Sequence, residues 1–474
     1  MEQSRLHAFT DDDALGRGDA TEVAERISRG EISPTEALEA ALARLDSVDE
    51  VLGGLRFEDF DRARHRATVA APRGAFGGVP SAIKDNVTFS GMAVTMGSEA
   101  LPTSPQGSHG PFVRQFLDTG LNPIGTTTCP PFGWTATTER VHGDVTRNPW
   151  HTAYSSGGSS GGSASLVAAG VLPIAHANDG GGSIRIPAAA CGLVGLKASR
   201  GRMLGDPTTA HMPVDIVCNG VVARSVRDVA RFFEAAERTH KNPAMPSIAG
   251  VDGAPARRLR IGMILDSPFA PATDVATRTA VEEAARQLEA LGHEVEPYEP
   301  AVSKHFASDF VDYWSMIAWA IVANGKREFG PDFDKARLDP LTLGLAKRYS
   351  RRLHRTPLVV GRLRDSARLY EKRFGDVDLV MSPVLTHTTP EIGYLSADLT
   401  SEEHMSRLVP YASFTPLHNA CGAPAISLPL GQTDDGRPIG VMLSARTGQD
   451  RRLLEIAFEL EAAQPLGRFA RVDD

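Results

Sequence analysis

The sequence YSSGGSSGGSASLVAAGVLPIAHANDGGGSIRIPAAACGLVGLK, residues 154–197, contains two glycine clusters, and serines stand within the first and directly after the second. Two of these serines are Ser159, which follows two glycines, and Ser183, which follows three. Glycine leaves the backbone uncovered, so a ligand can approach closely and backbone N–H groups can point at developing negative charge. Serines in such loops suit an acyl-transfer site.

A flexible linker is the alternative interpretation of the first Gly/Ser run, because Gly/Ser-rich segments commonly join domains. The residues that follow favour a folded core. Residues 163–169 are small or helix-forming, Val171–Ala175 is apolar like a short strand, and Asp179–Ser183 has the composition of a sharp turn. A linker needs no second glycine cluster so soon.

Three blocks of sequence together resemble the amidase signature hydrolases. They are GVPSAIKDNV (78–87), GGSSGGSA (157–164) and GGGSIRIPAAACGLVGLK (180–197). The resemblance implies an α/β amidase signature fold, with a central twisted mixed β-sheet covered by helices on both faces. It also implies a catalytic triad of Lys84 as base, Ser159 as the bridging serine with a cis peptide bond, and Ser183 as nucleophile. The segment HANDGGGSIRIPAAACG is most similar to the branch of this family that contains nylon-oligomer cyclic-dimer hydrolases.

Lys84 lies at the end of a mostly apolar run, Val79–Ile83, which predicts a buried strand. Burial disfavours the charged ammonium, so the pKa falls and the neutral amine can accept a proton. We expect this amine to draw a proton from Ser183 through the hydroxyl of Ser159. The sequence leaves open whether Ser159 or its neighbour Ser160 bridges.

The backbone N–H groups of the second glycine cluster are the candidate oxyanion hole. The predicted donors are those of Gly180, Gly181, Gly182 and Ser183, where no side chain obstructs the tetrahedral intermediate. Asp179 and Arg185 flank the loop, and we expect them to brace it; a surface ion pair is the alternative.

Candidate substrate-pocket residues come from two further segments. Residues 126–134 read TTTCPPFGW where the family commonly has T-N-x-x-E before an aromatic residue, so Cys129 could be a pocket wall, a reactive thiol or a buried structural thiol. The candidates are Cys129, Trp134, Tyr313 and Trp314, and the last two belong to an aromatic stripe that could equally be core. Residues 340–410 are expected to carry substrate selectivity.

The pattern of the chain predicts its organisation. Residues 1–70 are expected to be a helical arm packed on the core, and residues 71–474 the amidase catalytic domain. The second subunit of a homodimer is another surface that this arm could cover. Strands are predicted at 258–265, 293–297, 377–383, 425–429 and 439–445, and helices at 225–239, 276–291, 303–324 and 450–463. Ser33-Pro34-Thr35-Glu36 has the form of a capped helix start.

Composition narrows the class of partner. The 474 residues are 42% hydrophobic and 23% charged, with a formal net charge of −8, and no basic stripe suits nucleic acid. The four cysteines have no CxxC spacing, so neither a zinc site nor a disulfide framework is expected, and no cofactor is implied. The N-terminus lacks a signal sequence, and Met316–Ala323 is too short to span a bilayer. The expected protein is cytoplasmic and acts on a small-molecule amide, without a membrane or nucleic-acid partner.

Three alternatives stand beside this reading. Residues 157–161 satisfy G-x-S-x-G, which would make Ser159 the nucleophile of an α/β-hydrolase, although no apolar strand precedes it. The chain could instead be the catalytic subunit of an amidotransferase, although NDGGGS at 178–183 differs from the TDTGGS typical there. Lastly, the loops could form an anion-binding nest without catalysis. The favoured prediction is hydrolysis of a linear, aryl or cyclic carboxamide through a serine acyl-enzyme.

Overall fold

The computed structural model describes residues 5–69, 73–206, 209, 212–299, 302–375, 377–464 and 466. Its helices are α1 (Ala20–Ser28), α2 (Pro34–Leu52), α3 (Phe60–Val69), α4 (Pro111–Asp118), α5 (Gly161–Ala168), α6 (Arg185–Cys191), α7 (Val226–Thr239), α8 (Val275–Ala290), α9 (Phe306–Phe329), α10 (Pro340–Ser350), α11 (Thr356–Arg373), α12 (Ser401–Tyr411), α13 (Pro416–Cys421) and α14 (Asp450–Ala463). Its strands are β1 (Leu55–Glu58), β2 (Pro80–Lys84), β3 (Asn122–Thr127), β4 (Arg147–Asn148), β5 (His151–Ser155), β6 (Ile174–Asp179), β7 (Val194–Lys197), β8 (Cys218–Ala223), β9 (Arg260–Met263), β10 (Glu294–Pro297), β11 (Leu379–Pro383), β12 (Ala425–Gln432) and β13 (Pro438–Ser444).

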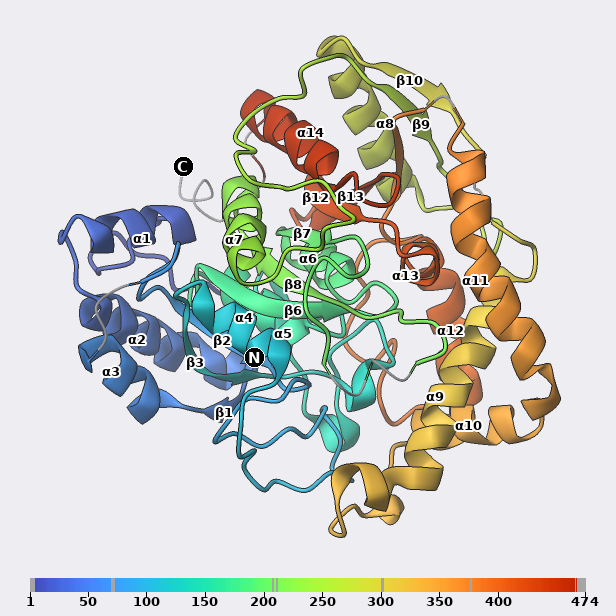
Figure 1. The fold of residues 1–474 in the computed structure, drawn as a ribbon, viewed down its shortest axis with the longest axis horizontal. Helices are drawn as coiled ribbons and strands as arrows, with labels where there is room; N and C mark the ends of the chain where they lie inside the picture. Colours follow the sequence, from blue (N-terminus) through green and yellow to red (C-terminus); the bar gives the residue numbers. More distant parts are fainter. Residues whose placement is uncertain are drawn as a thin grey trace.

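An eight-stranded sheet with the order β10-β9-β11-β13-β12-β7-β8-β6 forms the centre of the molecule (Figure 1). Strands β10, β9 and β11 pair in parallel, and the remaining pairs are antiparallel, so the sheet is mixed. A smaller sheet, β1-β3-β2, lies next to β6, since the Ser81 hydroxyl donates to the carbonyl of Ile174 at 2.8 Å. This contact joins the starts of β2 and β6, and their ends meet where Lys84 contacts Asn178.

Helices cover both faces of the central strands. Along β13, Val441 and Leu443 belong to the same buried cluster as residues of α8 and α14. Gly440 and Met442, which alternate with these residues along β13, face α6 on the other side of the sheet. Met442 clusters with Ala189 of α6, and a Cβ added at Gly440 would meet Ala189 at 2.4 Å. This period-two division is what a sheet between two helical layers requires. The predicted α/β fold class is confirmed.

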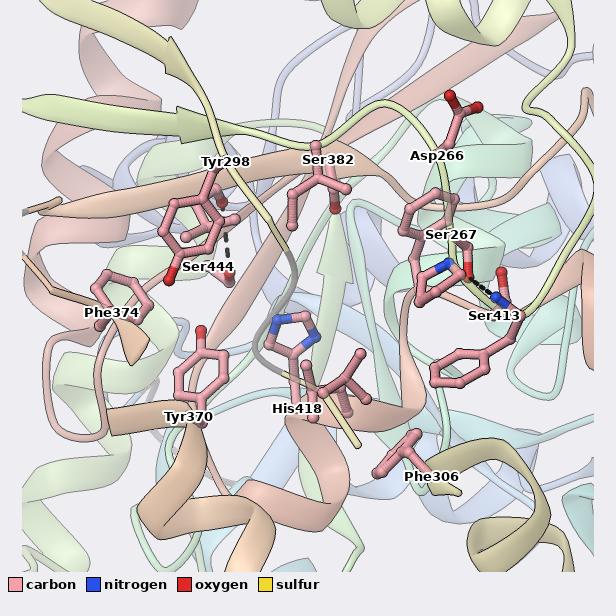
Figure 2. A pocket seen from close by; sticks show the side chains of 17 residues that line it. Asp266, Ser267, Tyr298, Phe306, Tyr370, Phe374, Ser382, Ser413, His418 and Ser444 are labelled. Atoms are coloured by element: carbon pink, nitrogen blue, oxygen red, sulfur yellow. Dashed lines mark hydrogen bonds between the residues drawn. The ribbon is translucent and has the colours of Figure 1, made fainter. Parts of the chain in front are cut away.

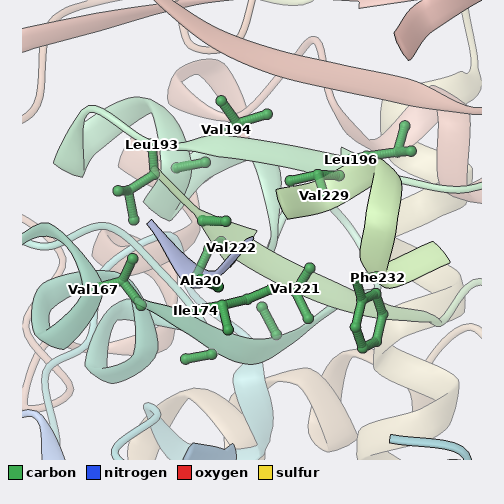
Figure 3. Close-up of a cluster of buried hydrophobic side chains, with 14 of the residues drawn as sticks. Ala20, Val167, Ile174, Leu193, Val194, Leu196, Val221, Val222, Val229 and Phe232 are labelled. Atoms are coloured by element: carbon green, nitrogen blue, oxygen red, sulfur yellow. The ribbon is translucent and has the colours of Figure 1, made fainter. Parts of the chain in front are cut away.

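Strands β6, β7 and β8 are apolar along most of their length because both of their faces are buried. Figure 3 shows Val194, Leu196, Val221 and Val222 from these strands in one buried cluster with Phe232 of α7, and all five are fully buried. Each such side chain contributes about 1.5–3 kcal/mol when it leaves water. Strand β6, which leads into the second glycine cluster, is therefore anchored in the buried core.

Helix α2 begins at the predicted capped start. Ser33 caps α2 in a reciprocal capping box with Glu36, and Asp19 caps α1 by accepting from the N–H of Glu22. Buried residues of α1 and α2 belong to the same hydrophobic cluster as the sheet, and β1 pairs with β3. In Figure 1 these helices (blue) lie across the molecule from α9–α11 (yellow to orange). The division into an arm, 1–70, and a catalytic domain, 71–474, stays a prediction.

Most other predicted elements are present with small shifts of their ends, and α14 coincides with its predicted range. The strand predicted at Val171–Ala175 was misplaced, because β6 begins at Ile174, one residue after Pro173. Proline has no N–H for a ladder, so pairing with β8 starts only after it. Helix α9 continues to Phe329, beyond the predicted end at residue 324, and Lys326 and Arg327 favour its C-terminal turn. None of the described helices is both long and apolar enough to cross a bilayer.

Candidate active site

Lys84 ends strand β2, all of whose residues are buried, and its side chain is fully buried. Its Nζ lies 2.7 Å from the Oγ of Ser159, 3.0 Å from the Oγ of Ser160 and 2.8 Å from the Oδ1 of Asn178. The lysine thus reaches from the small sheet to the loop before α5 and to the end of β6. Three segments that are far apart in the sequence meet at one amine.

Burial lowers the pKa of Lys84 from its ordinary 10.5 to about 8, against the opposing influence of Cys129 and Asp179. The backbone N–H of Lys84 donates to Nδ1 of His176 at 3.2 Å. Burial, followed by the charge of Lys84, lowers the pKa of His176 to about 3, so this imidazole is neutral. The site therefore offers an amine that can be uncharged near neutral pH.

Ser159 and Ser160 occupy the loop between β5 and α5, and the peptide bond between Gly158 and Ser159 is cis. The loop fits closely against Thr137 and Thr138. A Cβ at Gly158 would lie 2.5 Å from the carbonyl oxygen of Thr137, which explains the glycine. The Thr138 hydroxyl donates to the carbonyl of Gly157 at 2.8 Å. Strand β5 pairs with β4 in a separate two-stranded ribbon, with one isolated bridge between Tyr154 and Glu391, so it is not the central strand that a nucleophile elbow requires.

Ser183 lies in the turn between β6 and α6, one residue before Ile184, which caps α6. The Asp179 carboxylate shapes this turn, since its Oδ1 accepts from the N–H of Gly182 at 2.7 Å and its Oδ2 from that of Ile184 at 3.2 Å. Gly182 has φ +137°, and a Cβ there would lie 2.4 Å from Thr415 Oγ1. Only glycine fits this position.

The predicted oxyanion donors differ in availability. The Gly182 N–H is already bonded to Asp179. Within the described residues, the N–H groups of Gly180, Gly181 and Ser183 have no hydrogen-bond acceptor, and neither has the Ser183 hydroxyl. Gly180, Gly181 and Ser183 all line one cavity, which also contains Ser159. No direct hydrogen bond joins the hydroxyls of Ser159 and Ser183 in this structure.

Asp179 and Arg185 form a fully buried ion pair, with Arg185 Nη2 2.9 Å from Asp179 Oδ1. The alternative of a surface ion pair is therefore wrong. Burial raises the pKa of Asp179, but the charge and hydrogen bonds of Arg185, with a hydrogen bond from Asn419, outweigh it and hold this pKa well below its ordinary value. Arg185 also donates to the carbonyl of Thr415 and to Asn419 Oδ1. The pair thereby ties the serine-bearing turn to α13.

A second, smaller cavity of about 50 Å³ lies on the other side of α13 (Figure 2). Its lining includes Tyr370, Ser382 and Ser444 around the ring of His418. Nδ1 of His418 lies 3.2 Å from Arg185 Nη1, and burial, with the charge of Arg185, keeps the pKa of this histidine well below its ordinary value. A neutral His418 can accept from Arg185, which completes the support of the ion pair.

Arg185→Met is expected to lower the free energy of unfolding by about 3–5 kcal/mol, because it leaves the Asp179 carboxylate buried without its partner. Urea unfolding followed by circular dichroism measures the change. Arg257→Met is the matched control, since Arg257 is 59% exposed and pairs with Asp378 at the surface; it should change stability much less. Equal stability losses in the two variants would contradict the structural role given to Arg185.

The cavity that contains both serines has a volume of about 580 Å³. Trp134 and Trp314, two of the predicted pocket residues, line it. Helix α9 supplies much of the wall, and of residues 340–410 only Tyr349 is among the described lining residues. Residues 340–410 therefore contribute little to the described wall of this cavity, contrary to the expectation that they carry substrate selectivity. The further apolar lining residues include Val87, Met96, Phe132, Met212, Ile216, Val217, Met316, Ile317, Trp319, Ile321 and Phe329.

Cys129 and Tyr313, the other two predicted pocket residues, are not among the lining residues. Cys129 is 1% exposed, its Sγ lies 3.6 Å from the carbonyl oxygen of Asp85, and burial raises the pKa of its thiol to about 12. Such a thiol is not a nucleophile. The Tyr313 hydroxyl donates to the carbonyl of Val214 at 2.6 Å, so this side chain points into the core. The structural-thiol alternative for Cys129 fits its burial.

Sequence reasoning missed Asn178, although it contacts Lys84 directly and lines the cavity. Asn86 was missed as well; its Nδ2 donates to Asn178 Oδ1 at 3.0 Å. Both residues carry a usable signal, because they are polar residues at or just beyond the ends of buried strands that meet side by side. Polar side chains at strand ends commonly mark a site.

Comparison with known proteins identifies the family of this chain. Residues 36–454 match the Amidase family. The chain belongs to the amidase signature family. It is 45% identical over 467 residues to the protein named "Putative amidase AmiC" of Mycobacterium tuberculosis, with 98% of each chain covered. It is 34% identical over 471 residues to 6-aminohexanoate-cyclic-dimer hydrolase of Paenarthrobacter ureafaciens, with 94% of this chain and 95% of the other covered.

A solved structure of 6-aminohexanoate cyclic dimer hydrolase complexed with substrate superposes on this amidase with a TM-score of 0.87 at 31% identity, covering 95% of this chain and 97% of that one. The amidase thus hydrolyses carbon–nitrogen bonds of amides. The predicted family is confirmed, and the α/β-hydrolase and anion-nest alternatives are wrong.

Proposed function

We propose that this amidase hydrolyses a small carboxamide through an acyl-enzyme on Ser183, with Lys84 as the base and Ser159 as the bridge between them. The contact that carries the proposal is the one between the buried Lys84 Nζ and Ser159 Oγ at 2.7 Å, at the edge of a cavity that also holds Ser183. A lysine with a pKa lowered to about 8 is suited to proton transfer near neutral pH.

The proposed reaction begins when substrate places its carbonyl carbon against the Ser183 hydroxyl. Neutral Lys84 takes the Ser159 proton as Ser159 takes that of Ser183, and the Ser183 oxygen bonds to the carbonyl carbon. The oxygen of the tetrahedral intermediate is stabilised by the unoccupied N–H groups of Gly180, Gly181 and Ser183. Breakdown cleaves the C–N bond, and the proton held by Lys84 returns through Ser159 to the leaving nitrogen.

Water then enters and repeats the sequence against the acyl-enzyme. The same relay accepts a proton from water, hydroxide adds to the ester carbon, and Ser183 leaves with a proton. No residue outside the three is needed to move protons. Labelling with a fluorophosphonate, followed by peptide mass spectrometry, tests the assignment: the phosphonate should be attached to Ser183, and attachment to Ser159 or Ser160 would refute it.

The charge of the cavity wall points to the substrate. Of its described residues, Asp206 and Glu328 are acidic, and none is lysine, arginine or histidine. A carboxylate-bearing substrate would meet like charge without a partner, whereas a neutral or cationic amide would not. We therefore propose that the substrates are amides that are uncharged or cationic and otherwise apolar, whether linear, aryl or cyclic.

Matched anilides with and without a carboxylate on the acyl chain are expected to differ at least about tenfold in kcat/KM, in favour of the uncharged one. Release of aniline by the purified chain alone measures this, and it also separates a stand-alone hydrolase from an amidotransferase subunit that needs partners. Glu328→Gln combined with Asp206→Asn should narrow the ratio. A preference for the carboxylate would contradict the proposed substrate class.

We further propose a cytoplasmic location. All four cysteines are free and buried, as a reducing compartment allows. Cell fractionation tests this location.

The homodimer suggested by the N-terminal helices is likewise a proposal, and light scattering of the purified chain decides it.

A further inference from the structure

We propose that Asn178 is a positioning residue that fixes the direction of proton transfer at Lys84, so that the lone pair of the amine faces Ser159 and no other group. The inference rests on the proposed role of Lys84 as the base. It concerns a residue outside the triad, and it decides between Ser159 and Ser160 as the bridge.

The hydrogen bonds around the amine support this assignment. A neutral lysine amine has two N–H bonds and one lone pair, and three oxygens surround Nζ within 3.0 Å. The Oδ1 of Asn178 can only accept, so one N–H must point to it. Asn86 Nδ2 donates to the same oxygen at 3.0 Å, and an ammonium form of Lys84 also needs an acceptor there, so both contacts agree with the Asn178 amide oxygen facing Lys84.

Ser160 takes the second N–H. Its Oγ donates to the backbone carbonyl of Asn178 at 3.3 Å, and a hydroxyl has only one hydrogen to give. Ser160 must therefore accept from Lys84. The lone pair is left for the hydroxyl hydrogen of Ser159, so Asn178 acts on the geometry through both its side chain and its carbonyl.

The same contacts also fit the protonated amine, which donates to all three oxygens. Only the bond to Ser159 reverses between the two states, so the proton enters and leaves along that bond. The titratable groups that interact with Lys84 are the Asp179 carboxylate, the Cys129 thiol and the His176 imidazole. Of the side chains that touch Nζ, all are uncharged.

Asn178→Asp keeps the size of the side chain and puts a negative charge 2.8 Å from Nζ, where Oδ1 now lies. This charge should hold the amine as ammonium. The test uses the full-length chain and the rate of fluorophosphonate labelling of Ser183 between about pH 5.5 and 10.5. We expect the rise of this rate with pH to move up by at least about one pH unit, a tenfold loss below the midpoint, with recovery at high pH.

Asn219→Asp is the matched control, because Asn219 lines the same cavity but its Oδ1 lies at 3.4 Å from His176 Nε2 instead of at Lys84. Its midpoint should move less than half as far. An unmoved midpoint in Asn178→Asp, or an equal shift in both variants, would overturn the inference.

Asn178→Ala keeps the inference falsifiable if the aspartate variant does not fold, as judged by its melting temperature. It removes an acceptor without adding charge, so labelling should slow across the pH range while the midpoint does not rise. A wild-type rate at every pH would overturn the inference. If Ser183→Ala is still labelled, or Lys84→Met keeps the wild-type pH dependence, the proposed function itself is refuted. If Ser183→Ala is not labelled and Lys84→Met loses the pH dependence, but the midpoint of Asn178→Asp does not move, only the positioning role is refuted.

Discussion

Ser183→Ala is expected to reduce amide turnover by a factor of about 10⁴–10⁶, since removal of a serine nucleophile leaves only binding and oxyanion stabilisation. Ser183 is 9% exposed and lines the cavity, and its hydroxyl is not engaged in a hydrogen bond with any described residue. The alanine side chain is a single methyl group that keeps the Cβ and lacks only the hydroxyl, so it fits without strain. The fold, and with it the melting temperature, should therefore be retained.

Release of free amine from an anilide measures this loss, with fluorophosphonate labelling as an independent readout of the nucleophile. Ser413→Ala is a suitable control, because Ser413 lines the smaller cavity of Figure 2 and its Oγ has no hydrogen-bond partner among the described residues. It should keep wild-type turnover. Turnover near the wild-type rate in Ser183→Ala would show that another group attacks the carbonyl.

The sequence predicted which residues belong to the candidate site, but not the direction in which each side chain points. The apolar run before Lys84 predicted the burial that lowers its pKa, and the glycines before Ser159 and Ser183 predicted close-fitting loops. The run does not reveal which oxygens surround the amine, because these come from segments 75 and 94 residues away. The role of Asn178 therefore emerged only from the three-dimensional arrangement.

Two local errors have simple physical causes. Tyr313 and Trp314 are consecutive on α9, and neighbours on a helix point about 100° apart, so one faces the cavity while the other reaches Val214 in the core. The glycine cluster looked like four equivalent donors. The Asp179 carboxylate takes the Gly182 N–H, because a carboxylate at the start of such a turn accepts from the N–H groups that follow.

Lys84→Met is expected to lose most of the activity at every pH, because no other described side chain at hydrogen-bond distance from Ser159 can accept its proton. In the wild type, activity should rise with pH through about 8, the lowered pKa of Lys84, since only the neutral amine is a base. At pH 7 about one amine in ten is neutral, against about one in 3,000 at the ordinary pKa of 10.5. Burial thus increases the active fraction about 300-fold.

The measurement is turnover and fluorophosphonate labelling from about pH 6 to 10, and the variant should lack the rise near 8 altogether. Lys197→Met provides the control, since Lys197 is also fully buried at a strand end, but its Nζ donates to the carbonyl of Ala198 at 2.8 Å and not to Ser159. That variant is expected to keep the rise in activity with pH, whatever its effect on stability. If Lys84→Met regained the full wild-type rate at high pH, hydroxide would suffice as the base; the buried amine would then be a structural contact of Ser159, and the relay would have no function.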